Sequence, residues 1–407
     1  MIPFSPPHID EAIIREVADT LRSGWITTGP KTKLFEKKLT DYYGSKSTLC
    51  LNSATAGLEL ILRWFGVKEG DEVIVPAYTY CATANVVLHC GAKAVFTDVN
   101  PSDFNISVEK IKAAITDKTK VIIPVDFAGY PCDYDEINAL VNNPAIKKLF
   151  RPVSAEQQAL GRILVLADSA HSIGARYKGR FTGSITDAAV FSFHAVKNLI
   201  TAEGGAIALN LPPPFDNGTI YRTLAVKSLH GQNKDALAKT QKGAWRYDVV
   251  EPGYKYNMTD LAAAIGLIEL SRYSEDILPK RKKIFDFYSS FFSEYSWAQI
   301  PEYENQDKKS SYHVYALRIK NISERERDDI IKEISEREVS VNVHFIPVPM
   351  MSFYHSLGYN ISNYPAAFDC YSREISLPVY YDLTENQMQT VAEAVAASVK
   401  KVLEIKK

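Results

Sequence analysis

Ile163-Leu164-Val165-Leu166-Ala167-Asp168 is an uninterrupted apolar run that ends on a carboxylate. Three similar β-branched runs precede it, at residues 72–76, 94–98 and 120–125. Segments with the apolar spacing of helices lie between them, over 82–89 and 108–115. Continuous apolar runs separated by helices predict a mostly parallel sheet that is covered on both faces. Ligands of such sheets bind at the carboxyl ends of the strands, where Asp168 is expected to lie.

The overall composition is that of an ordinary globular enzyme. The chain has 407 residues, of which 47 are basic and 48 are acidic, giving a formal net charge of −1. This near-cancellation argues against a nucleic-acid partner, which normally selects a basic excess. No apolar stretch approaches the roughly 18–20 residues that a bilayer span needs, and the first residues lack a signal-peptide pattern. We therefore expect no membrane contact and a cytoplasmic location.

The cysteines and histidines show no metal-binding or disulfide pattern. The five cysteines are scattered, and no two form a C-x-x-C pair. No two of the eight histidines are three to five residues apart. We therefore expect no metal site and no disulfide framework.

The second half of the chain predicts a continuation of the sheet and then a smaller unit. Expected strands and helices there are strands at 189–193, 203–209, 312–319 and 341–345, and helices at 261–272, 279–293, 324–339 and 386–403. Thr259 is placed to cap one of these helices, and Ser323 with Glu326 has the spacing of a capping box. Strands interleaved with helices after residue 272 predict a small α+β domain. We expect a large domain at 1–272 and a small one at 273–407.

One lysine stands out once the common signatures are set aside. The sequence has no P-loop, no G-x-G-x-x-G and no G-x-S-x-G motif. Lys197 leaves the apolar run Phe191-Ser192-Phe193 and is followed by the small residues of 202–206. A partly desolvated lysine can lose its proton and attack a carbonyl. Taken alone, however, Lys197 is far better explained as a solvated loop lysine.

The surroundings of Lys197 resemble a known family. The block Ser192–Asn198 with Gly204-Gly205 is similar to the lysine loop of the DegT/DnrJ/EryC1/StrS sugar aminotransferases. The resemblance continues over nearly the whole chain, through residues 23–30, 52–56, 70–80, 167–171 and 252–260. It implies fold type I, the aspartate aminotransferase-like α/β fold, with pyridoxal 5′-phosphate (PLP) as cofactor.

The resemblance assigns the three catalytic positions. Lys197 would hold the cofactor and later move a proton as general base and acid. Asp168 would keep the ring nitrogen of the cofactor protonated, and His171 would bond its phenolic oxygen. The alternatives from the residues alone are a turn aspartate for Asp168 and a core histidine for His171.

Further cofactor contacts follow from the same resemblance. Ser53-Ala54-Thr55 opens a helix, and helix N-termini bind phosphate. Ser192 would add a hydroxyl to that phosphate, and Tyr80 would stack on the ring. Asn257 matches an asparagine that reaches the phosphate across a dimer interface, which implies a homodimer with shared active sites.

Within the family, the motifs of this sequence are most similar to those of members that act on UDP-linked 4-keto sugars. Trp25, Ile26, Thr27, His344 and Phe345 are carried over as substrate contacts. The implied reaction moves an amino group, with glutamate as the expected donor, to a nucleotide-linked keto sugar for polysaccharide or lipopolysaccharide synthesis.

Three other functions stay open at this stage. They are a TDP-keto-sugar aminotransferase, a PLP-dependent sugar dehydratase and a cofactor-binding regulator. Lysine rather than histidine at position 197 favours transamination over dehydration. The segment 141–162 is expected to be a surface insertion.

Overall fold

The computed structural model describes residues 1–234 and 246–404. Its centre is a seven-stranded sheet of order β1-β9-β8-β5-β4-β2-β3, in which β9 runs antiparallel to both neighbours. The remaining pairs, β8–β5, β5–β4, β4–β2 and β2–β3, are parallel. The strands are β1 (Ser47–Leu51), β2 (Glu72–Pro76), β3 (Lys93–Thr97), β4 (Thr119–Ile122), β5 (Leu164–Asp168), β8 (Ala188–Ser192) and β9 (Gly205–Leu209). The predicted mostly parallel α/β sheet is confirmed.

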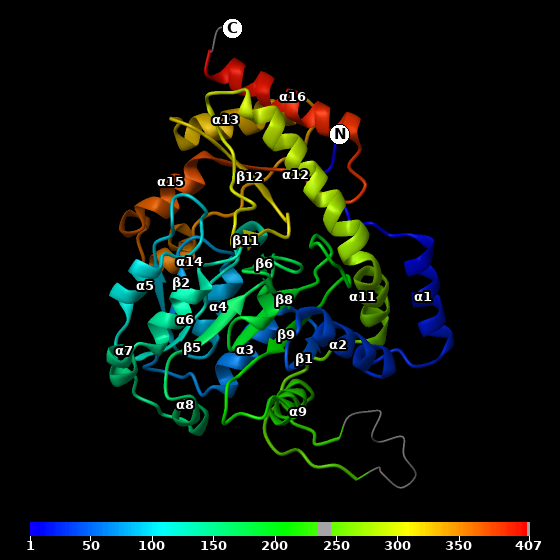
Figure 1. Cartoon of the computed structure of the whole chain (residues 1–407), viewed down its shortest axis with the longest axis vertical. Helices are drawn as coiled ribbons and strands as arrows, with labels where there is room; N and C mark the ends of the chain where they lie inside the picture. The colour runs from blue at the N-terminus through cyan, green and yellow to red at the C-terminus, as the bar shows by residue number, and fades with distance from the viewer. Residues whose placement is uncertain (235–245, 405–407) are drawn as a thin grey trace.

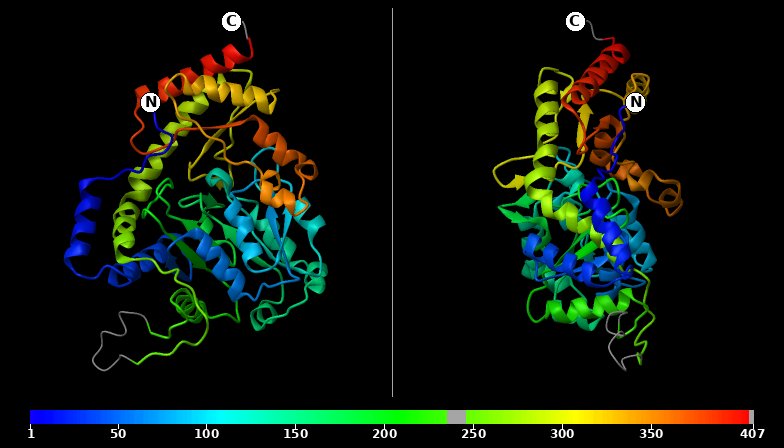
Figure 2. Two further views of the ribbon diagram at one scale, coloured as in Figure 1. Left: turned by 180° about the vertical axis from the view of Figure 1, so that it is seen from behind. Right: turned by 90° about the vertical axis from the view of Figure 1, so that its right-hand side faces the viewer.

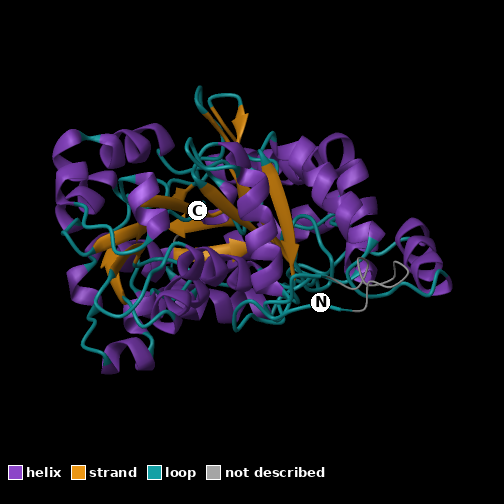
Figure 3. Ribbon diagram, turned by 90° about the horizontal axis from the view of Figure 1, so that it is seen from below, coloured by secondary structure: helices purple, strands orange, loops and turns teal. Residues whose placement is uncertain are grey.

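Helices lie on both sides of this sheet, as the view from below shows (Figure 3). The helices of this part of the chain are α1 (Glu11–Arg22), which packs on α11, and α2 (Pro30–Tyr43), α3 (Ala54–Trp64), α4 (Cys81–His89), α5 (Val108–Ala114), α6 (Tyr134–Asn142), α7 (Pro144–Leu149), α8 (Ala155–Leu160), α9 (Asn217–Ser228) and α11 (Asp260–Arg272). Thr259 caps α11, because its side chain accepts the backbone N–H of Ala262. Burial of both sheet faces explains why the strands are apolar throughout.

The C-terminal part contains a second, smaller layer. Its strands are β10 (Ala298–Gln299), β12 (Tyr315–Ile319) and β13 (Glu374–Leu377), in that order, and all pairs are antiparallel. Its helices are α12 (Leu278–Ser293), α13 (Glu324–Ser335), α14 (Ser352–Ser356), α15 (Pro365–Arg373) and α16 (Glu385–Val402). A single π-helical turn, Tyr273–Ile277, joins α11 to α12. Figure 1 shows α12 rising from the level of the main sheet to α16.

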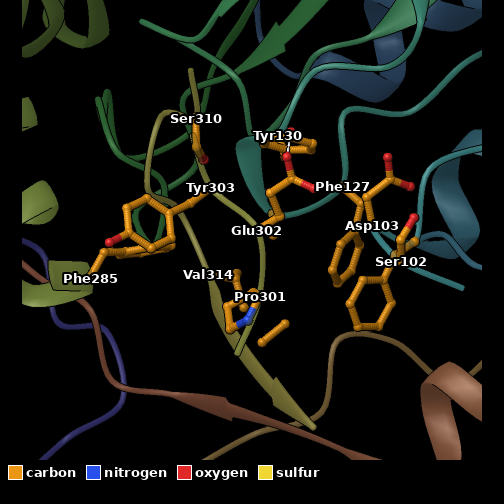
Figure 4. A pocket seen from close by; sticks show the side chains of 13 residues that line it. Ser102, Asp103, Phe127, Tyr130, Phe285, Pro301, Glu302, Tyr303, Ser310 and Val314 are labelled. Carbon is orange, nitrogen blue, oxygen red and sulfur yellow. Dashed lines mark hydrogen bonds between the residues drawn. The ribbon is translucent and has the colours of Figure 1, made fainter. Parts of the chain in front are cut away.

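A third, small sheet links the two parts. It consists of β6 (Arg176–Tyr177), β7 (Arg180–Phe181) and β11 (Lys308–Lys309). Figure 4 looks into a small hollow at the seam, where Phe127 and Tyr130 from the large-sheet side meet residues of the C-terminal part. There the hydroxyl of Tyr130 donates to Glu302 Oε1 at 2.8 Å.

The buried apolar residues form two clusters, one around the main sheet and one around β12 and β13. The two clusters do not correspond strictly to the N-terminal and C-terminal parts of the chain. Tyr354 and Tyr371 belong to the first cluster, whereas Ile2 packs against the second. Figure 2 shows the N-terminal segment reaching from α1 to the C-terminal part. The boundary at 272/273, which falls at the start of the π-helical turn, stays a prediction.

Two predicted elements differ most from the structure. The helix expected at 324–339 begins with the predicted capping box but ends at Ser335, because the chain turns and Val339 pairs with Ile2. The expected strand at 341–345 is wrong: only Asn342 forms a bridge, to Ser376. The next backbone groups are taken by side chains, since Glu374 accepts the His344 N–H and the hydroxyl of Tyr78 donates to the His344 carbonyl.

The segment 141–162 forms the short helices α7 and α8. Its second half is anchored, because Ser154 Oγ and Gln157 Nε2 both donate to the carbonyl of Phe65. Within residues 1–234 and 246–404, no helix is both long and apolar enough to span a bilayer, and no cluster of three potential metal ligands occurs.

Candidate active site

A cavity of about 400 Å³ opens at the carboxyl ends of β5 and β8, beside the N-termini of α3 and α4. Most of the predicted site residues line it. They are Ser53, Ala54, Thr55, Tyr80, Asp168, His171, Ser192, Lys197, His344 and Phe345. The structure therefore gathers side chains from both halves of the chain around one space, as the strand-end rule for such sheets predicts.

Lys197 lies in a tight turn that leaves β8. Its backbone N–H donates to the carbonyl of His194 at 2.8 Å, and Thr201 N–H donates to the carbonyl of Phe193 at 2.8 Å. These bonds hold the lysine over the cavity. Burial lowers the pKa of the Lys197 amine to about 8, and the negative charge of Asp168 opposes that shift. The amine therefore loses its proton more easily than a solvated lysine, which a nucleophile requires.

Asp168 ends β5 and is held by two hydrogen bonds. Thr83 Oγ1, from α4, donates to Oδ2 at 2.8 Å, and the N–H of Ala170 donates to Oδ1 at 3.2 Å. Burial raises the pKa of the carboxyl, and these two hydrogen bonds, with the charge of Lys197, oppose the rise. A buried carboxylate with few partners is suited to a cationic ligand atom.

Asp126 lies beneath Asp168 and was missed from the sequence. It accepts the hydroxyls of Tyr134, Ser169 and Ser172 and the N–H of Cys132. Its own N–H donates to the carbonyl of Asp168. Asp126 therefore fixes the loop that carries Asp168. A signal existed, because Asp126 follows the apolar run 120–125 as Asp168 follows 163–167.

His171 carries a buried nitrogen without a partner. Its Nδ1 has no hydrogen bond, while its ring stacks on Phe345 with centroids 5.7 Å apart and contacts the ring of His313 at 4.3 Å. Burial and the nearby charge of Lys197 hold the pKa of His171 well below its usual value, so the ring is neutral. Buried polar atoms are rarely left unpaired, so this nitrogen points to a bound ligand.

His313 and Asn198 form a further layer that the sequence did not indicate. His313 Nδ1 bonds Asn198 Oδ1 at 2.7 Å, and Asn198 Nδ2 donates to the carbonyl of Ser311 at 2.7 Å. Because Asn198 follows Lys197 directly, this network ties the lysine turn to the C-terminal part.

The start of α3 is shaped for an anion. Ser53 is its N-cap and accepts the N–H of Ala56 at 3.1 Å. Strand β9 passes so close that a Cβ on Gly205 would lie 2.5 Å from the backbone nitrogen of Ala54. Glycine is therefore required there for the helix start to face the cavity. Free N–H groups at a helix N-terminus, with Ser192 nearby, fit a phosphate.

Four predicted residues lie elsewhere: Trp25, Ile26, Thr27 and Asn257 do not line this cavity. Trp25 Nε1 donates to the carbonyl of Thr28, and Asn257 Nδ2 donates to Thr28 Oγ1 at 2.7 Å. Ile26 is 48% exposed. Within one chain these residues form a separate surface group, and their roles at the site stay predictions.

The residues around the cavity fit PLP. An aldehyde needs the low-pKa amine of Lys197, a pyridinium nitrogen needs a buried carboxylate such as Asp168, and a phosphate needs the start of α3. The orphaned Nδ1 of His171 leaves a bond for a further polar atom. This site on this sheet defines a PLP-dependent enzyme of fold type I.

Comparisons with known proteins give the family. Residues 7–150 and 152–396 match the DegT/DnrJ/EryC1/StrS aminotransferase family. The chain belongs to this family, and it is a PLP-dependent sugar aminotransferase that uses an amino donor.

Three relatives illustrate the similarity. A Streptococcus pneumoniae protein described as a candidate sugar aminotransferase, solved in its PMP form, superposes with a TM-score of 0.95 at 46% identity, over 99% of this chain and 100% of that chain. The spore coat polysaccharide biosynthesis protein SpsC of Bacillus subtilis is 36% identical over 98% of this chain and 97% of its own. The UDP-4-amino-4-deoxy-L-arabinose–oxoglutarate aminotransferase of Shewanella sediminis is 34% identical, covering 97% of each chain.

Proposed function

We propose that this enzyme transfers the amino group of L-glutamate to the 4-keto group of a UDP-linked sugar, in the cytoplasm, for cell-surface polysaccharide or lipopolysaccharide synthesis. The observation that carries the proposal is the buried Lys197 amine, which shares one cavity with Asp168 and His171. The name of the Shewanella relative supports both the UDP-linked amino sugar and the oxoglutarate–glutamate pair. That of SpsC supports polysaccharide synthesis.

The residues divide the work as follows. PLP, when bound, supplies an aldehyde and an electron-withdrawing ring. The N-terminus of α3 with Ser192 would bind its phosphate, Asp168 would face the ring nitrogen and Tyr80 would cover the ring. Lys197 would anchor the cofactor through its Nζ. Once released by the donor, the same Nζ would take and return a proton, a role that its lowered pKa favours.

His344 and Phe345, which line the cavity, would contact the sugar. The described lining contains no arginine, and Lys197 is its one side chain of lysine or arginine type. A cofactor phosphate, a donor carboxylate and a nucleoside diphosphate together bring more negative charge than this lining balances. We therefore propose a homodimer in which a second copy completes the site. Asn257 and the Trp25–Thr27 loop of that copy carry no charge, and they would add hydrogen-bond donors to the phosphates.

The experiment offers UDP- and TDP-linked 4-keto sugars to the purified enzyme with ¹⁵N-labelled glutamate. Mass spectrometry of the product is expected to show the label on the UDP sugar, and Lys197→Ala is expected to abolish it. Label only on the TDP sugar would overturn the nucleotide assignment. A product that has lost a hydroxyl without gaining label would indicate a dehydratase instead.

A further inference from the structure

His344 is held on three sides within the cavity wall. Its backbone N–H donates to Glu374 Oε2 at 3.0 Å, and its carbonyl accepts the hydroxyl of Tyr78. Its imidazole ring stacks on Phe4 with centroids 5.6 Å apart. The ring therefore keeps one orientation toward the cavity, before any ligand is bound.

A chain of hydrogen bonds leads away from the ring. His344 Nδ1 bonds Ser376 Oγ at 2.9 Å, and Ser376 Oγ bonds Glu374 Oε1 at 2.5 Å. Ser376 and Glu374 are both fully buried, on strand β13. His344 Nδ1 is thus occupied by its hydrogen bond to Ser376. Nε2 has no partner within residues 1–234 and 246–404, so it is the ring atom left for a ligand.

We infer that Glu374 and Ser376 are positioning residues that set the tautomer of His344, and that His344 Nε2–H thereby donates a hydrogen bond to the carbonyl oxygen of the keto sugar. This inference rests on the proposed function, because it concerns the sugar and not the amino donor. A hydroxyl has one proton, so the direction of one bond in the chain fixes the next. When Glu374 is protonated it donates to Ser376, Ser376 donates to Nδ1, and the ring proton is on Nε2. When Glu374 is ionised the order reverses, and Nε2 becomes an acceptor.

The surroundings of Glu374 favour the protonated setting at neutral pH. Burial raises its pKa to about 8. The Ser376 hydroxyl, which donates to the carboxylate when Glu374 is ionised, the backbone N–H of His344 and the charges of Arg327 and Arg318 oppose that rise. Tyr78 also interacts electrostatically with Glu374. A donor at Nε2 suits the chemistry, because the sugar oxygen becomes more negative as nitrogen adds to its carbon and must finally leave as water.

The test measures the two half-reactions separately by stopped-flow absorbance of the cofactor. In Ser376→Ala the reaction of the amino form with the keto sugar is expected to slow at least tenfold, while the reaction with glutamate stays within about twofold. Ser376→Thr, which keeps the hydroxyl, is the matched control and is expected to restore the sugar rate. The unchanged glutamate reaction also shows that the variant is folded and loaded.

A second variant tests the direction of the hydrogen bonds from Glu374 through Ser376 to His344. In the native enzyme the sugar rate is expected to decline as the pH rises through about 8. Glu374→Gln places a permanent N–H donor toward Ser376, so its sugar rate is expected to persist without that decline. Equal slowing of both half-reactions in Ser376→Ala, or an unchanged pH profile in Glu374→Gln, would overturn the inference while the native enzyme still aminates the sugar. If the native enzyme aminates no keto sugar, the proposed function fails first and this inference with it.

Discussion

The hydroxyl of Thr83 donates to Oδ2 of Asp168 at 2.8 Å, in a buried position beneath the cavity. Thr83 is itself bonded to Thr79 Oγ1 at 2.9 Å, so the carboxylate is the end of a short chain of hydroxyls. The bond counteracts the rise that burial imposes on the Asp168 pKa. Thr83 therefore helps to keep a negative charge where the ring nitrogen of the cofactor is expected.

Removing this donor is expected to weaken the cofactor site. In Thr83→Val the pKa of Asp168 rises further, so the carboxyl holds a cationic ring less well and kcat falls about tenfold. Thr83→Ser keeps the hydroxyl and serves as the control. Activity and the absorbance spectrum of the bound cofactor measure the effect; a Thr83→Val enzyme with native kcat and spectrum would remove Thr83 from this role.

Much of the main sheet and its site was predictable because it rests on local signals. Buried parallel strands are apolar on both faces, so the sequence alone predicts β5 and the aspartate at its end. The cap at Thr259 and the capping box at Ser323 obey spacing rules within one turn of helix. The roles of Lys197 and His171 came from the family resemblance instead.

The missed features depend on contacts between distant segments. Residues 341–345 have the composition of a strand. The side chains of Glu374 and Tyr78, however, bond to the N–H and carbonyl of His344, which a neighbouring strand would otherwise pair with. No local sequence pattern indicates these long-range bonds. Asn198 and His313 meet across 115 positions of sequence. The placement of Trp25 outside the cavity could not be predicted locally either, since it follows from how one chain folds, whereas the family resemblance already assigned Asn257 to the site of a second chain.

Gly205 is expected to be intolerant of a side chain. In Gly205→Ala the new methyl would lie 2.5 Å from backbone atoms of Ser53 and Ala54, so the start of α3 must shift. Overpacking of this kind costs about 1–3 kcal/mol of unfolding free energy, and the displaced helix start weakens cofactor binding. Gly218→Ala is the matched control, because its Cβ would meet atoms no closer than 3.5 Å. Denaturant unfolding and cofactor titration report the two effects; native values for both would contradict the tight approach of β9.

The buried Lys197 amine makes the cofactor-free protein sensitive to pH. Its pKa is about 8 when folded and about 10.5 when unfolded, so between these values the unfolded chain binds more protons than the folded one. Stability from this group therefore rises with pH over the window from 8 to 10.5, by about 3 kcal/mol in all. Lys197→Met has no amine to titrate and does not bury a charge at low pH, so it is expected to be more stable than the native protein below pH 8. This difference in unfolding free energy is expected to shrink as the pH rises from 8 to 10.5. Urea unfolding of cofactor-free samples measures it, with the exposed Lys110→Met as control; a constant difference would contradict the burial of a titrating amine.

The shared site of the proposed homodimer can be tested by complementation. Lys197→Ala removes the amine from the cavity of its own chain, whereas Asn257→Ala is expected to damage the cavity of the other chain. If both hold, unfolding and refolding the two inactive variants together yields mixed dimers with one intact site each, and about a quarter of native activity returns. A mixture of Lys197→Ala with Lys197→Met is the control and stays inactive. Since Asn257 Nδ2 also bonds Thr28 within its chain, a thermal melt of Asn257→Ala checks that the variant folds. Recovery no greater than the control would mean that each chain builds its site alone, with Asn257 serving only to hold the Thr28 loop.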